Sequence, residues 1–310
     1  MADRLVADVG ATNTRVGLAG ANGLRRGTAR SFANDGFAGL APLLARYIAN
    51  AGITPAALCA GVAGPVRDGA ARLTNRDWVI DPGELAAATG ARDIHLLNDL
   101  QAQGYALDDI APDSLTPIRA GRPDPAGPRM VLGLGSGCNI AVVHRVAGRL
   151  FVPPAEAGHA TLPHMDDATN ALITRLGADA PHKPAEAALS GPGLTRLHAA
   201  RTGRHLTPAG IIAAHRRGAA AATETLRVFT ALLGTRAGDL ALTHMATGGL
   251  FLIGGTARAV APVLAPQGFA AAFTAKGPYT DILRAIPVTL VTDDNAALAG
   301  CARCLRDTAA

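Results

Sequence analysis

Two glycine-rich turns, each lying between short apolar runs, are the residues that most directly indicate a chemistry. The first occurs in VADVGATNTRVGL at residues 6–18, and the second in VLGLGSGCNIAVV at residues 131–143. Both patterns predict a strand, a tight turn carrying hydroxyl side chains, and a second strand. Glycine lets the backbone approach a ligand closely, and successive N–H groups in such a turn form an anion-binding nest. Two nests facing each other across a cleft would suit a nucleotide polyphosphate, so phosphoryl transfer is the first hypothesis.

A carboxylate for that chemistry is available at Asp99. It follows the apolar run 94–97 and Asn98, at the point where a strand is expected to stop. Ligand sites in parallel-sheet proteins lie at such strand ends, and a carboxylate there could accept a proton from an attacking hydroxyl. Asn and Asp are also the residues that cap helices at their N-termini. The spacing alone favours neither role for Asp99 over the other.

Further polar candidates follow in two loops. Glu156 and His159 come after Pro153 and Pro154, and Glu186 comes before the segment SGPG at residues 190–193. A carboxylate and an imidazole this close together could bind vicinal hydroxyls through paired donors and acceptors. The same pair also suits a surface turn, and Glu186 taken alone is typical of a glutamate at the start of a helix.

Glycines flank the apolar run at residues 250–253, with Gly248-Gly249 before it and Gly254-Gly255 after it. Glycines at both ends of a short strand are typical of a backbone that lies against a ligand, here a nucleobase or a ribose. Close packing of a helix on the strand would explain the same pattern.

Several classes of protein are excluded. The chain has no G-x-x-x-x-G-K-[ST] motif, and neither Lys183 nor Lys276 follows a glycine-rich loop, so it is not a P-loop enzyme. The second turn is not G-x-G-x-x-G and leads into a strand, which argues against a dinucleotide fold. Scattered arginines and a net charge of +5 give no basic stripe for nucleic acid. The spacing of Cys301 and Cys304 fits small residues packing on a helix better than a metal site.

The elements that must position these residues indicate an α/β enzyme. The chain has 310 residues, of which 49% are hydrophobic and 17% charged, enough for one large domain or two ordinary ones with sizeable cores. No signal peptide and no apolar segment long enough to span a membrane is evident, so we expect a cytoplasmic protein.

Strands and helices are expected to alternate along most of the chain. We expect strands within 4–31, at 58–63, at 94–97, from 129 onward, at 250–253 and at 288–291; helices at 37–51, at 82–89, through most of 167–245 and from about 295. This order predicts a mostly parallel sheet with helices on its faces. The segment 109–128, rich in Pro, Asp and Gly, is the best domain boundary.

Taken together, seven segments resemble the bacterial ATP-dependent glucokinase family, within the actin, hexokinase and Hsp70-like superfamily. They are DVGATNTR (8–15), LTNRDW (73–78), LND (97–99), EAGH (156–159), EAALSGPGL (186–194), GGLFLIGG (248–255) and the stretch from IPV to DN (286–295). They occur in the family's order over almost the whole chain. No single segment is decisive, but the ordered set is specific.

The resemblance implies two RNase-H-like (actin-like ATPase) α/β domains flanking a deep cleft. The small domain would comprise residues 1–109 and 295–310, and the large domain residues 110–294. The resemblance also implies a homodimer that binds glucose and ATP with Mg²⁺, and that binds neither nucleic acid nor membrane.

It implies roles for individual residues as well. Asp99 would be the general base on the 6-hydroxyl of the sugar, and the other hydroxyls would be bound by Asn98, Glu156, His159 and Glu186. Asp8 would help to place Mg²⁺ through water. The phosphates and adenosine of ATP would be bound by Asp8, Gly10, Ala11, Thr12, Asn13, Gly135, Ser136, Gly137, Gly254 and Gly255.

The second phosphate turn departs from the family's usual Gly-Thr-Gly-Leu-Gly. Ser136 replaces the threonine and Asn139 replaces the last glycine, changes that bear on ATP affinity or on the choice of phosphate donor. Two alternatives to a glucokinase are therefore kept. One is a kinase for another hexose, such as mannose, fructose or an amino sugar; the other is a non-catalytic sugar sensor.

Overall fold

The computed structural model describes residues 3–176 and 182–308, and the chain divides into two compact units. The first unit comprises Met1–Ala111, Arg145–Pro154 and Asp293–Ala310; the second comprises Pro112–His144 and Ala155–Thr292. Residues 177–181, part of the stretch expected to be mostly helix, lie outside the described residues.

One segment departs from the expected domain boundaries. Residues 145–154, expected in the second domain, group with the first unit. The Leu150 N–H donates to the Asp307 carboxylate at 3.0 Å, and Arg145 forms an ion pair with Asp108 at 2.6 Å. These contacts join positions more than 30 residues apart, so the local sequence pattern gave no sign of them.

The sheet of the first unit has the order β3-β2-β1-β5-β9, with β4 paired to β2. Its strands are β1 (Arg4–Val9), β2 (Asn13–Gly20), β3 (Gly23–Leu24), β4 (Arg30–Ala33), β5 (Ala57–Val62) and β9 (Asp93–Asn98). Strands β1, β5 and β9 are parallel, and Val9, Val62 and Asn98 are register neighbours at their carboxyl ends. The turn after β1 and the residues after β9 therefore lie at the same edge of this sheet.

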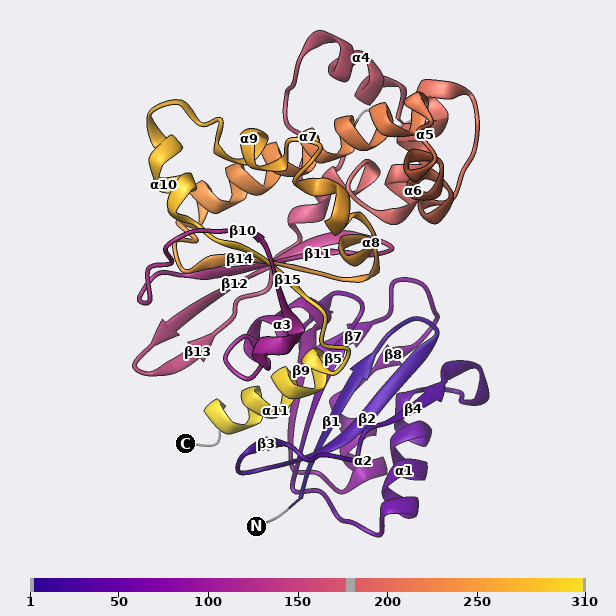
Figure 1. The fold of residues 1–310 in the computed structure, drawn as a ribbon. Coiled ribbons are helices and arrows are strands. Elements are labelled where there is room, and N and C mark those ends of the chain that lie inside the picture. The colour runs from indigo at the N-terminus through magenta and orange to yellow at the C-terminus, as the bar shows by residue number, and fades with distance from the viewer. Residues whose placement is uncertain (1–2, 177–181, 309–310) are drawn as a thin grey trace. The chain divides into compact units, whose positions relative to one another are not determined.

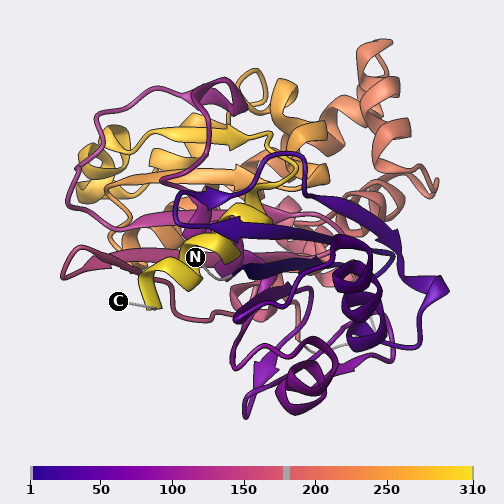
Figure 2. The same ribbon diagram turned by 90° about the horizontal axis from the view of Figure 1, so that it is seen from below.

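Helices cover both faces of that sheet (Figures 1 and 2). On one face, α1 (Leu40–Ala51) and α2 (Pro82–Thr89) share a core with Leu5, Ala7 and Val9 of β1. On the other face lie α3 (Asp99–Ala106) and the terminal helix α11 (Ala296–Thr308), which pack closely on each other. A small sheet of β6 (Val66–Arg67), β7 (Ala70–Arg72) and β8 (Val79–Ile80), together with β13 (Arg149–Phe151), completes the strands of this unit.

The second sheet has the order β10-β15-β14-β11-β12-β13. Its other strands are β10 (Leu115–Arg119), β11 (Arg129–Leu134), β12 (Cys138–Val146), β14 (Gly249–Ile253) and β15 (Val288–Val291); β11, β14 and β15 are parallel. The division between the two units falls between Ala111 and Pro112, inside the segment 109–128, and the same segment also holds β10, which pairs antiparallel with β15. The sequence pattern did not predict this strand because it contains Pro117, and proline is tolerated in a strand only at a sheet edge.

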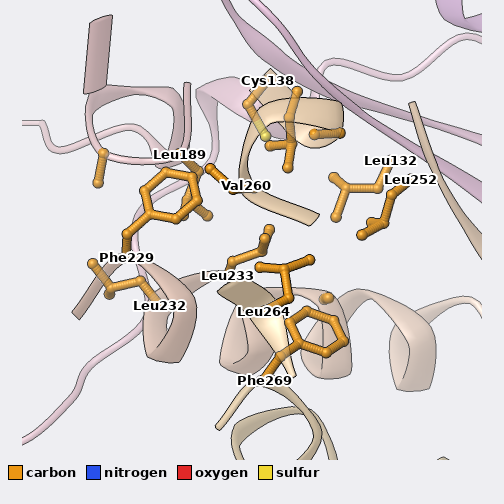
Figure 3. Close-up of a cluster of buried hydrophobic side chains, with 14 of the residues drawn as sticks. Leu132, Cys138, Leu189, Phe229, Leu232, Leu233, Leu252, Val260, Leu264 and Phe269 are labelled. Carbon is orange, nitrogen blue, oxygen red and sulfur yellow. The ribbon is translucent and has the colours of Figure 1, made fainter. Parts of the chain in front are cut away.

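Helices pack on the second sheet around a large apolar core. They are α4 (Asp167–Arg175), α5 (Gly191–Thr202), α6 (Pro208–Arg216), α7 (Ala220–Thr243), α8 (Gly255–Leu264), α9 (Phe269–Thr274) and α10 (Thr280–Ala285). Figure 3 shows Leu132 and Leu252 from neighbouring strands meeting Leu233 of α7 and Leu264 of α8. Among the helices that the structure describes, none combines the length and the apolar character needed to cross a bilayer.

Candidate active site

The first glycine turn follows β1 and is held from the protein side. The Gly10 N–H donates to the carbonyl of Asn13 at 3.0 Å. The amide of Asn34, which is fully buried, donates to the carbonyls of Gly10 at 2.7 Å and Ala11 at 3.2 Å. Thr14 in turn donates its hydroxyl to Asn34 at 2.8 Å. The carbonyls of the turn are thus occupied within the protein, which leaves a rigid backbone loop beside the exposed Thr12.

Asp8 lies immediately before this turn, on β1. It is the register partner of Arg15 on β2, and its Oδ2 lies 3.4 Å from the Arg15 Nη1. Burial raises the pKa of Asp8, and the Arg15 charge opposes that rise. The Asp8 side chain is mostly buried but keeps 21% of its surface exposed, and its carboxylate is the kind of oxygen donor that magnesium prefers, directly or through water.

Asp99 is the first residue of α3, and it is not the helix cap. Asn98 is the cap: its Oδ1 accepts the Leu100 N–H at 2.9 Å, and its own N–H donates to Oε1 of Gln101 at 2.9 Å. The Asp99 carboxylate also accepts the Leu100 N–H, at 2.8 Å, and is half-buried. Of the two roles that the sequence left open for Asp99, the cap therefore belongs to its neighbour. The Asn98 amide also donates to the Gly64 carbonyl at 3.3 Å, so much of its capacity is used within the protein.

The second glycine turn follows β11 in the second unit. The Gly135 N–H donates to the Gly137 carbonyl at 2.9 Å. The Gly135 carbonyl accepts two hydrogen bonds, from the Gly191 N–H at 2.8 Å and from the Thr256 hydroxyl at 3.0 Å. The turn is therefore anchored by the first residue of α5 and by the first turn of α8. Its Ser136 is exposed.

The glycine pair after β14 adjoins this turn. Gly254 has a φ of +104°, and a Cβ there would lie 2.4 Å from the Leu134 carbonyl oxygen, so both backbone geometry and space require glycine. Gly248 and Gly249, by contrast, lie at the opposite end of β14. A Cβ at Gly248 would meet the Gly127 carbonyl at 2.5 Å, which places it in a backbone contact within the fold rather than beside a ligand.

A pocket of about 830 Å³ opens beside the second turn. Its walls are mostly apolar, with threonine hydroxyls and one imidazole among them. The lining residues are Gly135, Ser136, Gly191, Pro192, Thr195, His205, Leu206, Thr207, Pro208, Ala209, Gly255, Thr256 and Ala259. A largely apolar pocket with a backbone turn at its edge can hold a flat heterocycle and place attached phosphates at the turn.

A polar cluster also lies beside this turn. The Nδ1 of His159 is 3.8 Å from the Oε1 of Glu186. A Cβ built at Gly137 would be 3.0 Å from the Oε2 of Glu186, so this carboxylate lies directly against the turn. Glu156 accepts a hydrogen bond from the Asn139 amide at 3.2 Å. Three polar side chains expected to bind hydroxyls are thus gathered next to one expected phosphate turn.

The loop that carries Glu156 and His159 is more than a surface turn. It forms the short 3-10 helix Ala157–His159, in which Gly158 is buried against the Cys138 carbonyl. Glu186 lies in a second short 3-10 helix, Ala185–Ala187, where Ser190 donates its hydroxyl to the Glu186 carbonyl at 2.8 Å. Both loops are therefore held by backbone contacts.

Sequence reasoning missed three residues that hold these turns, Asn34 and Arg76 at the first and Thr256 at the second, and it also missed the bonds of Asn139 to the loop at 155–157. Arg76 donates to the Ala11 carbonyl at 3.0 Å. Thr256 stands next to a glycine pair that was singled out, and Asn139 was noted only as a departure from a motif. Asn34 is the first residue of the tripeptide NDG, a pattern that predicts a turn but does not indicate that Asn34 bonds to the Gly10 and Ala11 carbonyls.

The cysteines are packing residues. Cys301 and Cys304 of α11 are buried together with Cys59 of β5, as the sequence favoured. Burial, reinforced by the neighbouring thiols, raises the pKa of Cys59 well above its usual value and so keeps it unreactive. Within residues 3–176 and 182–308, no group of three or more His, Cys, Asp or Glu side chains is arranged to hold a metal ion.

Comparisons with known proteins agree on one family. The family model described as "Glucokinase" matches residues 5–308. A glucokinase of Nitrobacter hamburgensis is 32% identical over 308 residues, which covers 96% of each chain. The crystal structure of a glucokinase from an Antarctic psychrotroph has a TM-score of 0.88 and 32% identity, covering 98% of this chain and 99% of that one.

A more distant solved structure shares the fold. It is a ROK family glucokinase from Streptomyces griseus in complex with glucose and AMPPNP, with 17% identity, a TM-score of 0.66, and coverage of 97% of this chain and 98% of that one. These likenesses confirm the expected α/β fold of the actin-like ATPase type.

Proposed function

This chain belongs to the glucokinase family, and we propose that it transfers the γ-phosphoryl group of ATP to the 6-hydroxyl of glucose with Asp99 as the general base. One observation of the structure supports this most. Glu156, His159 and Glu186, which can bind hydroxyls, lie beside the anchored turn at Gly135, so the groups that we propose for sugar and those that we propose for phosphate lie close together in one unit.

Asp99 suits the role of base. Phosphoryl transfer depends on positioning and charge stabilisation, with a carboxylate orienting the nucleophile. Asp99 is held at the start of α3 by a helix terminus that Asn98 caps, so its carboxylate has a defined position and is only half-buried. A sugar hydroxyl ionises far above neutral pH, so Asp99 would take the proton late, as the bond to phosphorus forms.

MgATP would be bound by the two glycine turns. The turns at Gly10–Asn13 and Gly135–Gly137 would present backbone N–H groups to the phosphates, other than those of Gly10 and Gly135, which donate within their own turns. Asp8 would place the magnesium ion of the substrate through water. That ion neutralises charge on the transferred group when it is bound. The adenosine would occupy the apolar pocket, with Gly254 and Gly255 at its border. The complex of the Streptomyces griseus relative with AMPPNP supports the use of a nucleoside triphosphate.

Glucose would be bound through Asn98, Glu156, His159 and Glu186. Polar groups that lose their water when the sugar binds, and that a wrong epimer leaves unpaired, discriminate strongly between sugars, which favours one hexose. We also propose that the enzyme is a homodimer and acts in the cytoplasm, where ATP is available. Light scattering coupled to size exclusion would test the dimer.

The test is an ADP-release assay with MgATP and a panel of hexoses, followed by phosphorus NMR of the product. We expect release with glucose and a phosphate ester at carbon 6. Faster ADP release with mannose, fructose or an amino sugar would identify that sugar as the preferred substrate and leave the proposed mechanism unchanged. A protein that glucose stabilises thermally but that releases no ADP would support the sensor alternative.

A further inference from the structure

Asn139 stands where the second phosphate turn departs from the usual glycine, yet its side chain does not bond to the turn. Its four hydrogen bonds are made to Ile140 at 2.8 Å and to three consecutive residues of another loop, Ala155, Glu156 and Ala157. The residue in the phosphate motif is thus bonded to the loop that carries a candidate sugar ligand.

The orientation of the Asn139 amide is determined by its partners. The Oδ1 accepts the N–H groups of Ile140 at 2.8 Å and of Ala157 at 2.9 Å, and only the oxygen of an amide can accept. The Nδ2 must therefore face the other way. There it donates to the Ala155 carbonyl at 2.6 Å and to the Oε2 of Glu156 at 3.2 Å.

The Glu156 carboxylate is thereby restrained at both its backbone and its side chain. The loop on either side of it is bonded to Asn139, and Gly158 lies against the Cys138 carbonyl one residue earlier in β12. Other charged or titratable groups at this loop include Arg236, which donates to the Ala157 carbonyl at 3.1 Å, His182, whose Nε2 lies 2.7 Å from the His159 carbonyl oxygen, and His159 with Glu186. Of these contacts, only the one from Asn139 reaches the Glu156 carboxylate itself.

We propose that Asn139 is a positioning residue for sugar binding: its amide holds the Glu156 carboxylate in the orientation that accepts a hydroxyl of the sugar. Asparagine in place of the usual glycine then strengthens sugar binding and leaves ATP binding unchanged. This inference rests on the proposed function, in which Glu156 is a sugar ligand.

The test is a double-mutant cycle between Asn139 and Glu156. Asn139→Asp keeps the size and the acceptor oxygen but removes both donors and places a second carboxylate beside Glu156. We expect the KM for glucose to rise about tenfold to a hundredfold, as for loss of a hydrogen bond to a charged group, with the KM for ATP changed less than threefold. In a Glu156→Gln background the same change should raise the glucose KM less than threefold, because the glutamine amide can donate to the new carboxylate.

Two controls keep the test decisive. Asn139→Ala removes both the donors and the acceptor oxygen without adding charge, and should raise the glucose KM less than Asn139→Asp does, at an unchanged ATP KM. The rise in melting temperature on adding glucose gives a readout of binding that is independent of turnover. A parent protein that glucose stabilises without ADP release would refute the proposed function while the cycle could still be measured by binding.

The inference is overturned by either of two results. One is a penalty of Asn139→Asp that is the same in both backgrounds. The other is a rise in the KM for ATP equal to that for glucose, which would assign Asn139 to the phosphate turn after all.

Discussion

Gly158 offers a sharp test of how the sugar-binding loop is held. A Cβ at this position would lie 1.6 Å from the Cys138 carbonyl oxygen, whereas real Cβ contacts essentially never fall below 3.0 Å. The carbonyl cannot give way easily, because Cys138 is buried and begins β12, in register with Leu134 of β11. Alanine would therefore push the whole 3-10 helix Ala157–His159 outward by more than an ångström.

Such a displacement carries Glu156 and His159 with it. Misplacing a reacting or binding group by about 1 Å can cost roughly a hundredfold in rate. We expect Gly158→Ala to lower kcat/KM for glucose about a hundredfold, while the KM for ATP stays within about threefold, since the pocket lining does not include this loop. Initial rates of ADP release with each substrate varied in turn would measure both values.

Gly36→Ala is the matched control. Gly36 also belongs to a short 3-10 helix, Asn34–Gly36, but a Cβ there would meet nothing within 4 Å. It should leave both kinetic constants and the melting temperature near those of the parent. A kcat/KM for glucose within threefold of the parent value in Gly158→Ala would show that the loop has room for a Cβ, against the contact with the Cys138 carbonyl.

Three further predictions concern the turn anchor, the helix contact and a buried histidine. Thr256→Val should raise the KM for ATP about fivefold, which corresponds to the loss of one net hydrogen bond of roughly 1 kcal/mol, while Thr256→Ser should not raise it. The control is Thr230→Val, which removes a buried hydroxyl with no partner in the described residues and should leave the KM for ATP unchanged. Gly300→Ala would place its Cβ 1.7 Å from a carbonyl oxygen of α3, so calorimetry should show a loss of about 1–3 kcal/mol in unfolding free energy, and an unchanged melting temperature would count against this packing. Burial lowers the pKa of His198, so below pH 6.5 the unfolded chain binds a proton that the folded chain does not. The unfolding free energy should therefore decrease as the pH is lowered through this range. In urea titrations His198→Asn should weaken this dependence of the unfolding free energy on pH, and an unchanged dependence would contradict the role of His198.

Elements with strong local signals were predicted closely from the sequence. The helix at 82–89 has the predicted bounds because Asp81 caps its start, Pro82 suits its first position and Gly90 ends it in the left-handed conformation. The strand at 288–291 was likewise predicted from its apolar residues. The helix predicted from 37 begins only at Leu40, because the backbone of Phe37 and of Gly39 is extended, after the 3-10 helix Asn34–Gly36.

What the sequence could not show depends on contacts between distant segments. Strand β10 needs its pairing with β15 to offset the proline in it. The grouping of residues 145–154 with the first unit depends on partners near positions 108 and 307. Asn139 could be noted as unusual, but its bonds to the loop at 155–157 depend on where that loop folds back. The candidate site residues came mainly from the family resemblance, and their roles stay predictions.

Asp99→Asn decides whether Asp99 is the base of a glucose kinase. The change keeps the size of the side chain and an oxygen for the Leu100 N–H, so the fold and glucose binding should remain. We predict that ADP release with glucose falls by about a hundredfold to ten-thousandfold, while glucose still raises the melting temperature as in the parent. If Asp99→Asn turned over glucose at a rate within a few-fold of the parent rate, Asp99 would not be the general base.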